Sequence, residues 1–170
     1  MRVPLPWMGE YVALPTGPAA VTGEQVAADL VRVGLEEEAI HGGNVTGPLV
    51  VGRVLEFVDE RQKNGKTIRW CQVDVGESEP RGIVCGASNF FAGDKVVVSL
   101  PGAVLPGPFP ISARKTYGHV SDGMICSARE LGLGEDHHGI LRLAELDLQD
   151  AAVGSDAIAL LGLGEETVEV

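Results

Sequence analysis

The chain has 170 residues and a formal net charge of −11, and no apolar run approaches the roughly 20 residues that a membrane-spanning helix needs. A chain of this length can bury a good core, and it favours one domain or one domain with an inserted neighbour. Prolines interrupt the start, Met1–Trp7, where a signal peptide would need its apolar helix. The sequence therefore predicts a cytoplasmic protein that does not contact a membrane.

The acidic charge is unevenly distributed along the chain. Residues 1–40 carry two basic and six acidic side chains, residues 41–126 carry nine and eight, and residues 127–170 carry two and ten. A polyanionic partner is therefore expected to meet the middle segment. Even there the near-balance of charge predicts modest phosphate binding.

Cysteine and histidine usage does not favour a metal centre. Cys71, Cys85 and Cys126 are odd in number, widely spaced and embedded in apolar strands without a C-x-x-C pair, so we interpret them as buried thiols. The segment 135–138, Glu-Asp-His-His, contains metal-ligand residue types, but neighbouring residues rarely converge on one ion, and an exposed turn is the preferred interpretation. Catalytic and phosphate-binding motifs are absent, so neither a catalytic site nor a cofactor is expected in this chain.

The first forty residues predict a small α+β element. Trp7 and Tyr11 are spaced to share one face of a short helical turn. Thr22 and Gln25 have capping-box spacing, which predicts a helix that begins there and ends at Gly34. Its apolar face should consist of Val26, Leu30 and Val33, with Ala27 and Val31 beside them. A short strand with three exposed glutamates is expected at residues 35–40, followed by a linker at residues 41–48.

The middle of the chain predicts paired strands. Residues 49–58 and 68–75 should form an antiparallel hairpin, because Asn64-Gly65 between them is a turn signal. Residues 83–85 and 94–100 should be two further strands, the second of which Pro101-Gly102 ends. Their connection is too short for a crossover helix, so they should belong to a small antiparallel sheet or barrel. Residues 139–143 are expected to form the last strand of this module.

The end of the chain predicts a second contribution to the α+β element. Residues 155–162 should form a helix with Ser155 as its N-cap and Asp156 at its positive end. Residues 167–170 begin an alternating strand.

Several blocks of sequence resemble the bacterial phenylalanyl-tRNA synthetase β subunit, in the same order and spacing and over nearly the whole chain. These blocks are Ile83–Asn89, Ala92–Val96, Leu100–Pro106, Ser121–Ser127 and Glu130–Leu133. The resemblance implies a mainly β protein in which an OB-fold tRNA-binding module, residues 41–150, is inserted into a truncated α+β element, residues 1–40 and 151–170. Because the family's β subunit is several times longer, we expect this chain to be a segment of a longer one.

The resemblance also implies a role in a heterotetrameric ligase that charges tRNA with phenylalanine. ATP and magnesium would act in domains that this chain lacks. The implied partners are tRNA, the synthetase α subunit and the remaining β-subunit domains. The segment itself would contribute contacts and no chemistry.

Nine residues are candidates for nucleic-acid binding. Four lie in or beside the first hairpin loop, which in OB-folds is one of the surfaces that hold an oligonucleotide, although this loop departs from the family's usual pattern. Two cations and an aromatic side chain lie in residues 112–119, which form either a solvated turn or a phosphate contact with a stacking ring. Two more match family residues at the nucleic-acid surface; the methionine has core filling as its alternative role. The candidates are Arg61, Lys63, Lys66, Arg69, Arg114, Lys115, Tyr117, Ser121 and Met124.

Three functional hypotheses remain open from sequence. The chain is a β-subunit segment that acts inside the ligase, a free-standing tRNA-binding module, or a protein-interaction scaffold whose OB face no longer contacts RNA. The altered hairpin loop and the acidic flanks favour the scaffold more than they would in a typical family member.

Overall fold

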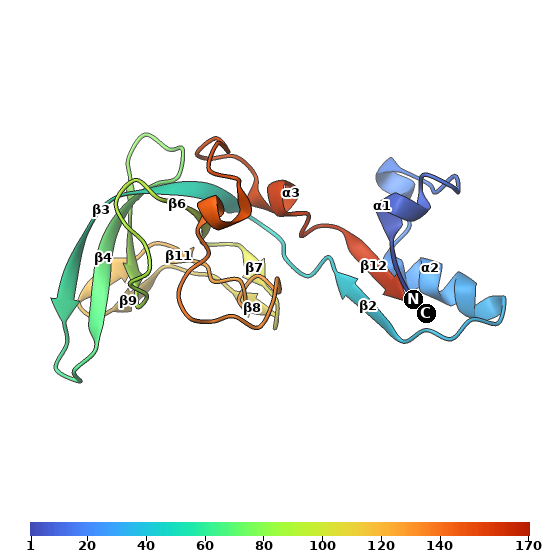
Figure 1. Ribbon diagram of the computed structural model, residues 1–170, viewed down its shortest axis with the longest axis horizontal. Coiled ribbons are helices and arrows are strands. Elements are labelled where there is room, and N and C mark those ends of the chain that lie inside the picture. Colours follow the sequence, from blue (N-terminus) through green and yellow to red (C-terminus); the bar gives the residue numbers. More distant parts are fainter. The chain divides into compact units, whose positions relative to one another are not determined.

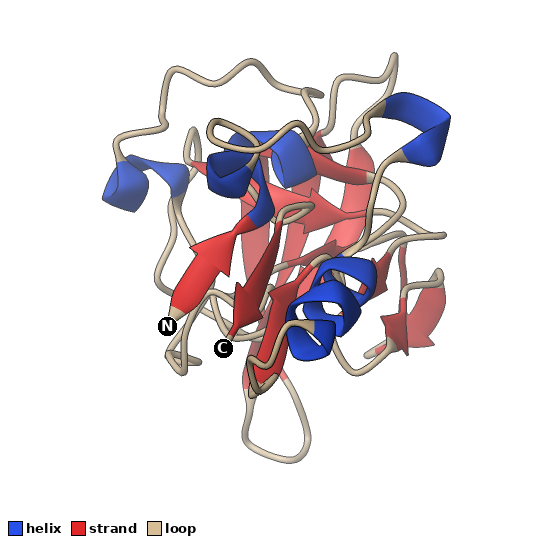
Figure 2. Ribbon diagram, turned by 90° about the vertical axis from the view of Figure 1, so that its right-hand side faces the viewer, coloured by secondary structure: helices blue, strands red, loops and turns tan.

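The computed structural model describes all 170 residues and divides them into two compact units. The smaller unit consists of Met1–Gly43 and Gly162–Val170, and the larger of Asn44–Leu161. Strands form most of the regular structure, and the helices are short (Figure 2). The prediction of a mainly β chain is confirmed.

The smaller unit is a three-stranded antiparallel sheet with a helix packed on it. The strand order is β1-β12-β2, so the last strand of the chain lies in the middle. Val168 of β12 is fully buried against Val26 and Ala27. The elements are β1 (Arg2–Pro4), α1 (Leu5–Met8), the 3₁₀ helix η1 (Gly17–Ala19), α2 (Gly23–Arg32), β2 (Ala39–Gly42) and β12 (Glu166–Glu169).

The predicted start of α2 is confirmed, and its predicted apolar face is partly wrong. Thr22 Oγ1 accepts a hydrogen bond from Gln25 N, and Gln25 Oε1 accepts one from Thr22 N, which completes the capping box. Val26 and Ala27 are buried, but Leu30 is only half-buried and Val31 is 48% exposed. Val33 is 77% exposed because it lies at the C-cap, beyond the last turn that faces the sheet. Gly34 follows with φ of 98°, as expected of a helix stop.

Two other local predictions for this unit need correction. The helical turn at the start spans Leu5–Met8 and so begins earlier than expected, although the Trp7 and Tyr11 rings do meet edge-on at 6.1 Å. β2 begins at Ala39 and continues to Gly42, so the three glutamates precede the strand and the first two residues of the predicted linker lie within it. The strand has this position because residues 39–42 pair with the four residues of β12.

Glu169 makes the stability of this sheet dependent on pH. Its carboxylate lies 2.6 Å from His41 Nε2 and 3.1 Å from Arg2 Nε, and the hydrogen bond to His41, followed by that to Arg2, lowers the pKa of Glu169. A lowered pKa stabilises the fold above the ordinary carboxyl pKa, and this stabilisation is lost as the pH falls through the folded value.

We therefore expect Glu169→Gln to lower the free energy of unfolding at pH 7 and to have little effect at pH 3. Urea titrations of both proteins at these two pH values measure this difference. A deficit of equal size at both pH values would contradict a role of the carboxylate charge.

The larger unit contains a nearly closed five-stranded antiparallel barrel (Figure 1). Its strand order is β11-β6-β3-β4-β5, and the two end strands approach each other across a seam. Across this seam Asp122 N donates to Gly82 O at 2.9 Å, and Val84 N donates to Ser121 Oγ at 3.0 Å. The barrel strands are β3 (Leu49–Arg61), β4 (Thr67–Asp74), β5 (Arg81–Cys85), β6 (Lys95–Ser99) and β11 (Met124–Ile125).

Shorter elements decorate the barrel between and after these strands. Two small hairpins, β7–β8 and β9–β10, lie in the long connection from β6 to β11. The elements are β7 (Val104–Leu105), β8 (Phe109–Pro110), β9 (Arg114–Thr116), β10 (His119–Ser121), the 3₁₀ helix η2 (Leu143–Leu146) and α3 (Ala157–Leu161). The predicted hairpin of residues 49–58 and 68–75 is confirmed as β3 paired with β4.

Alternating side chains of the strands fill the barrel. Val54 of β3, Cys71 and Val73 of β4, Ile83 of β5 and Val96 of β6 are fully buried in one cluster. This inward alternation leaves the intervening side chains of β4 on its outer face.

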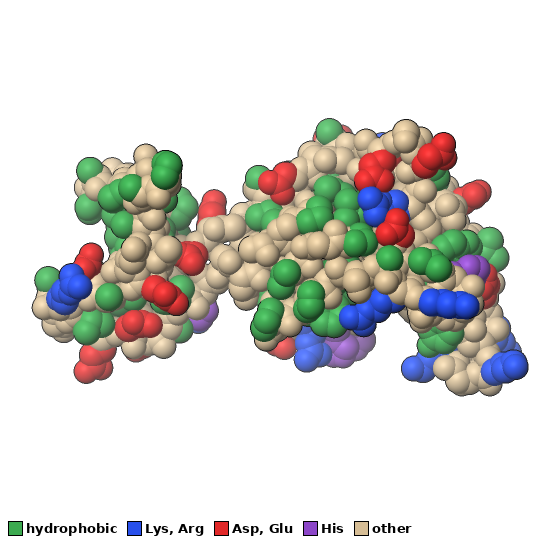
Figure 3. Space-filling model, turned by 180° about the vertical axis from the view of Figure 1, so that it is seen from behind, with side chains coloured by type: hydrophobic (Ala, Val, Ile, Leu, Met, Phe, Trp, Pro, Cys, Tyr) green, Lys and Arg blue, Asp and Glu red, His purple; other side chains and the backbone are tan.

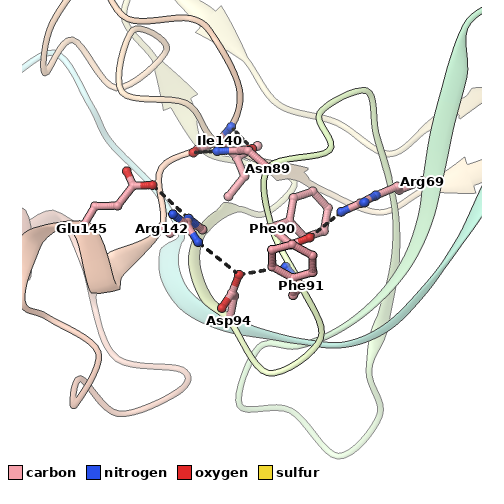
Figure 4. A network of polar contacts seen from close by, with 8 residues as sticks. All are labelled: Arg69, Asn89, Phe90, Phe91, Asp94, Ile140, Arg142 and Glu145. Atoms are coloured by element: carbon pink, nitrogen blue, oxygen red, sulfur yellow. Dashed lines mark hydrogen bonds and ion pairs between the residues drawn. The ribbon is translucent and has the colours of Figure 1, made fainter.

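The connection between β5 and β6 is held by polar contacts rather than by regular structure (Figure 4). The Asn89 side chain donates to Ile140 O and accepts from Ile140 N, both at 2.9 Å. Asp94 accepts from Phe91 N at 2.8 Å. The segment between the two predicted strands, residues 83–85 and 94–100, is therefore fastened to a loop some fifty residues later.

Two predictions for the last third of the chain are wrong. Residues 139–143 form no strand; Arg142 makes a single bridge to Val96, and its Nε bonds Glu145 as the chain turns into η2. Ser155 does not cap α3, because the helix begins at Ala157 and Ser155 lies one residue too early; its hydroxyl donates to Ala152 O. Asp156 takes that role, since its Oδ1 accepts from Ile158 N at 2.9 Å.

The three cysteines are free and buried, as predicted. Burial raises the pKa of Cys71 and of Cys126 to about 12, and it also raises that of Cys85. Since the thiolate is the reactive form, the raised pKa values leave few of these thiols reactive at pH 8 even before access is considered.

We expect no thiol of the folded chain to react with Ellman's reagent within minutes at pH 8, and all three to react in denaturant. A time course of released thionitrobenzoate checks this. A thiol that reacts rapidly without denaturant would contradict the burial described here.

Candidate nucleic-acid interface

The hairpin of β3 and β4 ends in a compact, cationic loop (Figure 1). Gln62 N donates to Lys66 O at 2.7 Å, Gly65 N donates to Gln62 O at 3.0 Å, and Gly65 has φ of 83°, which favours glycine at this turn. Arg61, Lys63 and Lys66 are exposed, and none of them forms an ion pair. Lys and Arg side chains are accordingly seen at this end of the larger unit (Figure 3, lower right).

Arg69, the fourth cation predicted for this loop, lies inside the structure. Its Nε bonds Asp59 at 3.0 Å, and its guanidinium lies between the rings of Phe57 and Phe90, 4.0 and 4.8 Å from their centroids. It also donates to Phe90 O and is only 9% exposed. Arg69 thus holds the β5–β6 connection against the hairpin, and its charge is already paired.

The second predicted group lies on the β9–β10 hairpin. Arg114 and Lys115 are exposed on β9 and form no ion pair. Tyr117 and Gly118 make the turn with φ of 49° and 80°, and the Tyr117 ring is 42% exposed. The predicted solvated turn and the predicted phosphate contact are both compatible with this placement.

Three side chains connect the two hairpins, and we call them the clamp: Glu60, Trp70 and His119. The His119 ring stacks on the Trp70 indole at 4.1 Å with an angle of 10° between the planes. His119 Nε2 lies 2.8 Å from Glu60 Oε1. Trp70 lies over Gly82, where a Cβ would come within 2.3 Å of the indole ring.

The clamp brings the two cation groups to the same end of the barrel. Glu60 directly precedes Arg61, and His119 pairs with Thr116 beside Lys115. The nearest carboxylates are also occupied, because Asp59 bonds Arg69 and Glu60 bonds His119. This end therefore presents five unpaired cations despite the acidic chain, namely Arg61, Lys63, Lys66, Arg114 and Lys115.

The remaining two candidates lie at the barrel seam. Ser121 is 7% exposed, and its hydroxyl accepts from Val84 N and donates to Gly123 O at 3.0 Å, so both of its bonds are made within the chain. Met124 is half-buried on β11 and lines the pockets on both sides of the seam.

One of these pockets, of about 230 Å³, lies beside the β9–β10 hairpin and contains residues that sequence reasoning missed. Phe109 is 44% exposed, and the Arg114 guanidinium lies 5.7 Å from its ring centroid. The signal that could have found it is an aromatic residue between Pro108 and Pro110, in the long connection of an OB-type barrel. The wall of this pocket consists of Val84, Phe109, Pro110, Ile111, Ser112, Arg114, Thr116, Ser121, Gly123 and Met124.

The segment with metal-ligand residue types is an exposed turn, as predicted. Asp136 accepts from His138 N at 2.9 Å, and this backbone hydrogen bond is the main cause of the lowered pKa of Asp136. No group of three or more potential ligand side chains converges on a common point in the chain.

Comparison with known proteins places the barrel in a family. Residues 49–152 match the family described as "Putative tRNA binding domain". The chain belongs to this family. The match covers the barrel strands, both hairpins and the seam, so all nine candidate residues lie within it.

The curated relatives agree with the resemblance found in the sequence. The chain is 62% identical to the phenylalanine–tRNA ligase β subunit of Leifsonia xyli, with 100% of this chain and 21% of the relative covered. It is 54% identical to that of Thermobifida fusca, with 100% and 20% covered, and 42% identical to that of Tropheryma whipplei, with 100% and 23% covered. The chain thus spans about a fifth of the length of these relatives.

The structure contains no helix with the length and apolar character to cross a membrane.

Proposed function

We propose that this chain is the tRNA-binding and assembly segment of a phenylalanine–tRNA ligase β subunit. In this proposal residues 41–150 act as the module that contacts tRNA, and residues 1–40 and 151–170 join the segment to other domains. The observation that carries the proposal is the clamp, which gathers five unpaired cations at one end of a chain with net charge −11.

The cations have the chemistry of phosphate contacts, which position a nucleic acid without reading its sequence. Lys63 and Lys66 extend furthest along the hairpin loop, and Arg114 and Lys115 lie on the neighbouring hairpin. Tyr117 would stack on a base beside them. Arg69 and Ser121 would affect RNA binding only indirectly, because the hydrogen bonds of both side chains are made within the barrel.

The likeness to complete β subunits extends the proposal to the rest of the ligase. The synthetase α subunit and the remaining β-subunit domains would be protein partners. ATP and magnesium would serve aminoacylation in those other domains, and the assembly would act in the cytoplasm. The segment would supply RNA or subunit contacts and leave the chemistry to the rest of the enzyme.

Titration of the 170-residue chain into labelled tRNA for phenylalanine tests the proposal. We expect weak binding at low salt, with log K falling against log salt by about 2–4 units per decade, as a few phosphate contacts give. An absence of binding at 50 mM salt, in a chain shown to be folded by circular dichroism, would overturn the proposal.

A protein-interaction scaffold is the second candidate, and one feature of the smaller unit favours it. A mostly apolar pocket of about 640 Å³ lies there, with Glu10, Glu165 and Glu166 in its wall. Trp7 and Tyr11 are also 51% and 77% exposed. An apolar surface with an acidic rim suits a protein segment better than RNA. Binding of the α subunit without any binding of tRNA would favour this candidate.

A further inference from the structure

The pocket of about 230 Å³ beside the β9–β10 hairpin, which we call the seam pocket, has a wall that no internal contact explains. Phe109 forms part of this wall and keeps 44% of its surface exposed, and it belongs to neither buried cluster. An aromatic ring that remains exposed beside a hollow is typical of a surface that meets a ligand.

The chemistry of the wall selects the class of ligand. Val84, Phe109 and Met124 present apolar surface, whereas the hydroxyls of Ser112 and Thr116 form no hydrogen bond within the chain. Arg114 lies over the Phe109 ring, and no carboxylate lines the pocket. A flat ring with polar edges, joined to an anionic group, fits apolar walls, free hydroxyls and an unpaired guanidinium.

The size of the pocket limits the ligand to one ring system. Pockets that enclose drug-sized molecules measure roughly 300–1,000 Å³, and this one measures about 230 Å³. The pocket also adjoins β9, which carries the unpaired Arg114 and Lys115. Arg114 and Thr116 line the pocket, so Lys115 between them points to the other face of β9. A ligand in the pocket would therefore have its anionic part beside Arg114.

We propose that the seam pocket receives one unstacked base of single-stranded RNA, and that Arg114 contacts the adjoining phosphate. This inference rests on the proposed function, because it names the part of the RNA that the module holds. Single-stranded RNA is recognised by splayed bases that stack on aromatic or guanidinium planes, and Phe109 with Arg114 supplies both surfaces.

The test compares two probes of equal charge, a uridine hexamer and a hexamer of the same ribose-phosphate backbone without bases. The 170-residue chain should bind the uridine hexamer about 5- to 150-fold more tightly, which is the range of one base stacked on an aromatic side chain. Both probes are measured in the Tyr117→Ala background, so that the Tyr117 ring cannot stack on a base, and there Phe109→Ala should bring the two affinities together. Ser112→Leu, at an exposed position in the pocket wall, should do the same by taking up space in the pocket without offering an aromatic plane.

Lys63→Ala is the matched control, because it lies outside the pocket and should weaken both probes by the same factor. Equal binding of both probes by the parent chain, or discrimination that survives both pocket variants, would overturn the seam pocket and leave the proposed function standing. Failure of both probes and of tRNA to bind at 50 mM salt would overturn the proposed function and this inference together.

Discussion

Lys63→Glu combined with Lys66→Glu is expected to weaken the binding of tRNA by about 100-fold at 50 mM salt and to flatten its salt dependence. Each phosphate contact contributes about 0.7–0.9 to the slope of log K against log salt, so losing two contacts removes about 1.4–1.8 units. If the affinities converge near 1 M salt, this difference in slope gives the roughly 100-fold loss. Titrations with several tRNAs at four salt concentrations measure both quantities, and all tRNAs should weaken about equally.

The control for this variant changes the net charge by the same amount elsewhere on the barrel unit. Arg53 and Arg129 are exposed and unpaired, and Arg53 lies towards the opposite end of β3 from the hairpin loop. Arg53→Glu with Arg129→Glu should therefore leave most of the affinity intact. An equal loss in the control would mean that tRNA responds to net charge and not to the hairpin loop.

Met124→Ala should lower the affinity for tRNA and leave the slope of log K against log salt unchanged, because the methionine side chain carries no charge. The same salt titrations measure both quantities.

The fold could be predicted from sequence where a local signal and tertiary packing agree. Thr22 and Gln25 cap α2 because both hydrogen bonds form within one turn of chain. Asn64-Gly65 lies in the β3–β4 loop because a tight turn needs a residue that accepts a positive φ. Such signals act over a few residues, and no distant partner alters them.

The failures lie where a distant or competing contact decides the conformation. Residues 139–143 have the composition of a strand, but the Asn89 amide takes both backbone groups of Ile140 and the Glu145 carboxylate takes Arg142. Ser155 has the right type for an N-cap, yet α3 begins one residue later than predicted and Asp156 accepts the capping hydrogen bond. The Asn89 contact cannot be identified from the local sequence, and two adjacent residues of N-cap type do not show which of them precedes the helix.

The candidate interface likewise contains features that the local sequence predicts and features that depend on distant contacts. Exposed cations on loops are visible in the sequence, and five of the six predicted cations are indeed exposed. That Arg69 is enclosed by Phe57 and Phe90 depends on a connection twenty residues away. That the two cation groups share one end depends on the stacking of Trp70 with His119, which is a contact between strands far apart in sequence.

Gly82→Ala is expected to destabilise the barrel by about 1–3 kcal/mol, the usual cost of forcing an extra methyl group into a packed site. The backbone of Gly82 would tolerate a side chain, since its φ is not positive. The cost arises from the Trp70 indole, because the added Cβ would lie 2.3 Å from Cη2 and 2.6 Å from Cζ2. Gly86→Ala is the matched control at the end of the same strand, because nothing lies within 4 Å of its Cβ position. Urea denaturation of the three proteins gives the comparison.

A double-mutant cycle identifies Trp70 as the cause. Trp70→Leu removes the ring atoms that meet the new Cβ, so in that background Gly82→Ala should cost only a few tenths of a kcal/mol. The same cost in both backgrounds would mean that another neighbour is displaced.

The Gly82→Ala variant also tests whether tRNA binding depends on how the cations are arranged, because it leaves their number unchanged. Displacing the indole removes the surface on which His119 stacks, so the β9–β10 hairpin loses one of its attachments beside Glu60. The charge of the chain does not change. If tRNA binds to both hairpins at once, Gly82→Ala should weaken it severalfold in protein that is still folded, whereas Gly86→Ala should not. Unchanged affinity in the folded Gly82 variant would mean that the hairpin loop of β3 and β4 binds without help from β9, and that Arg114 and Lys115 are solvated side chains.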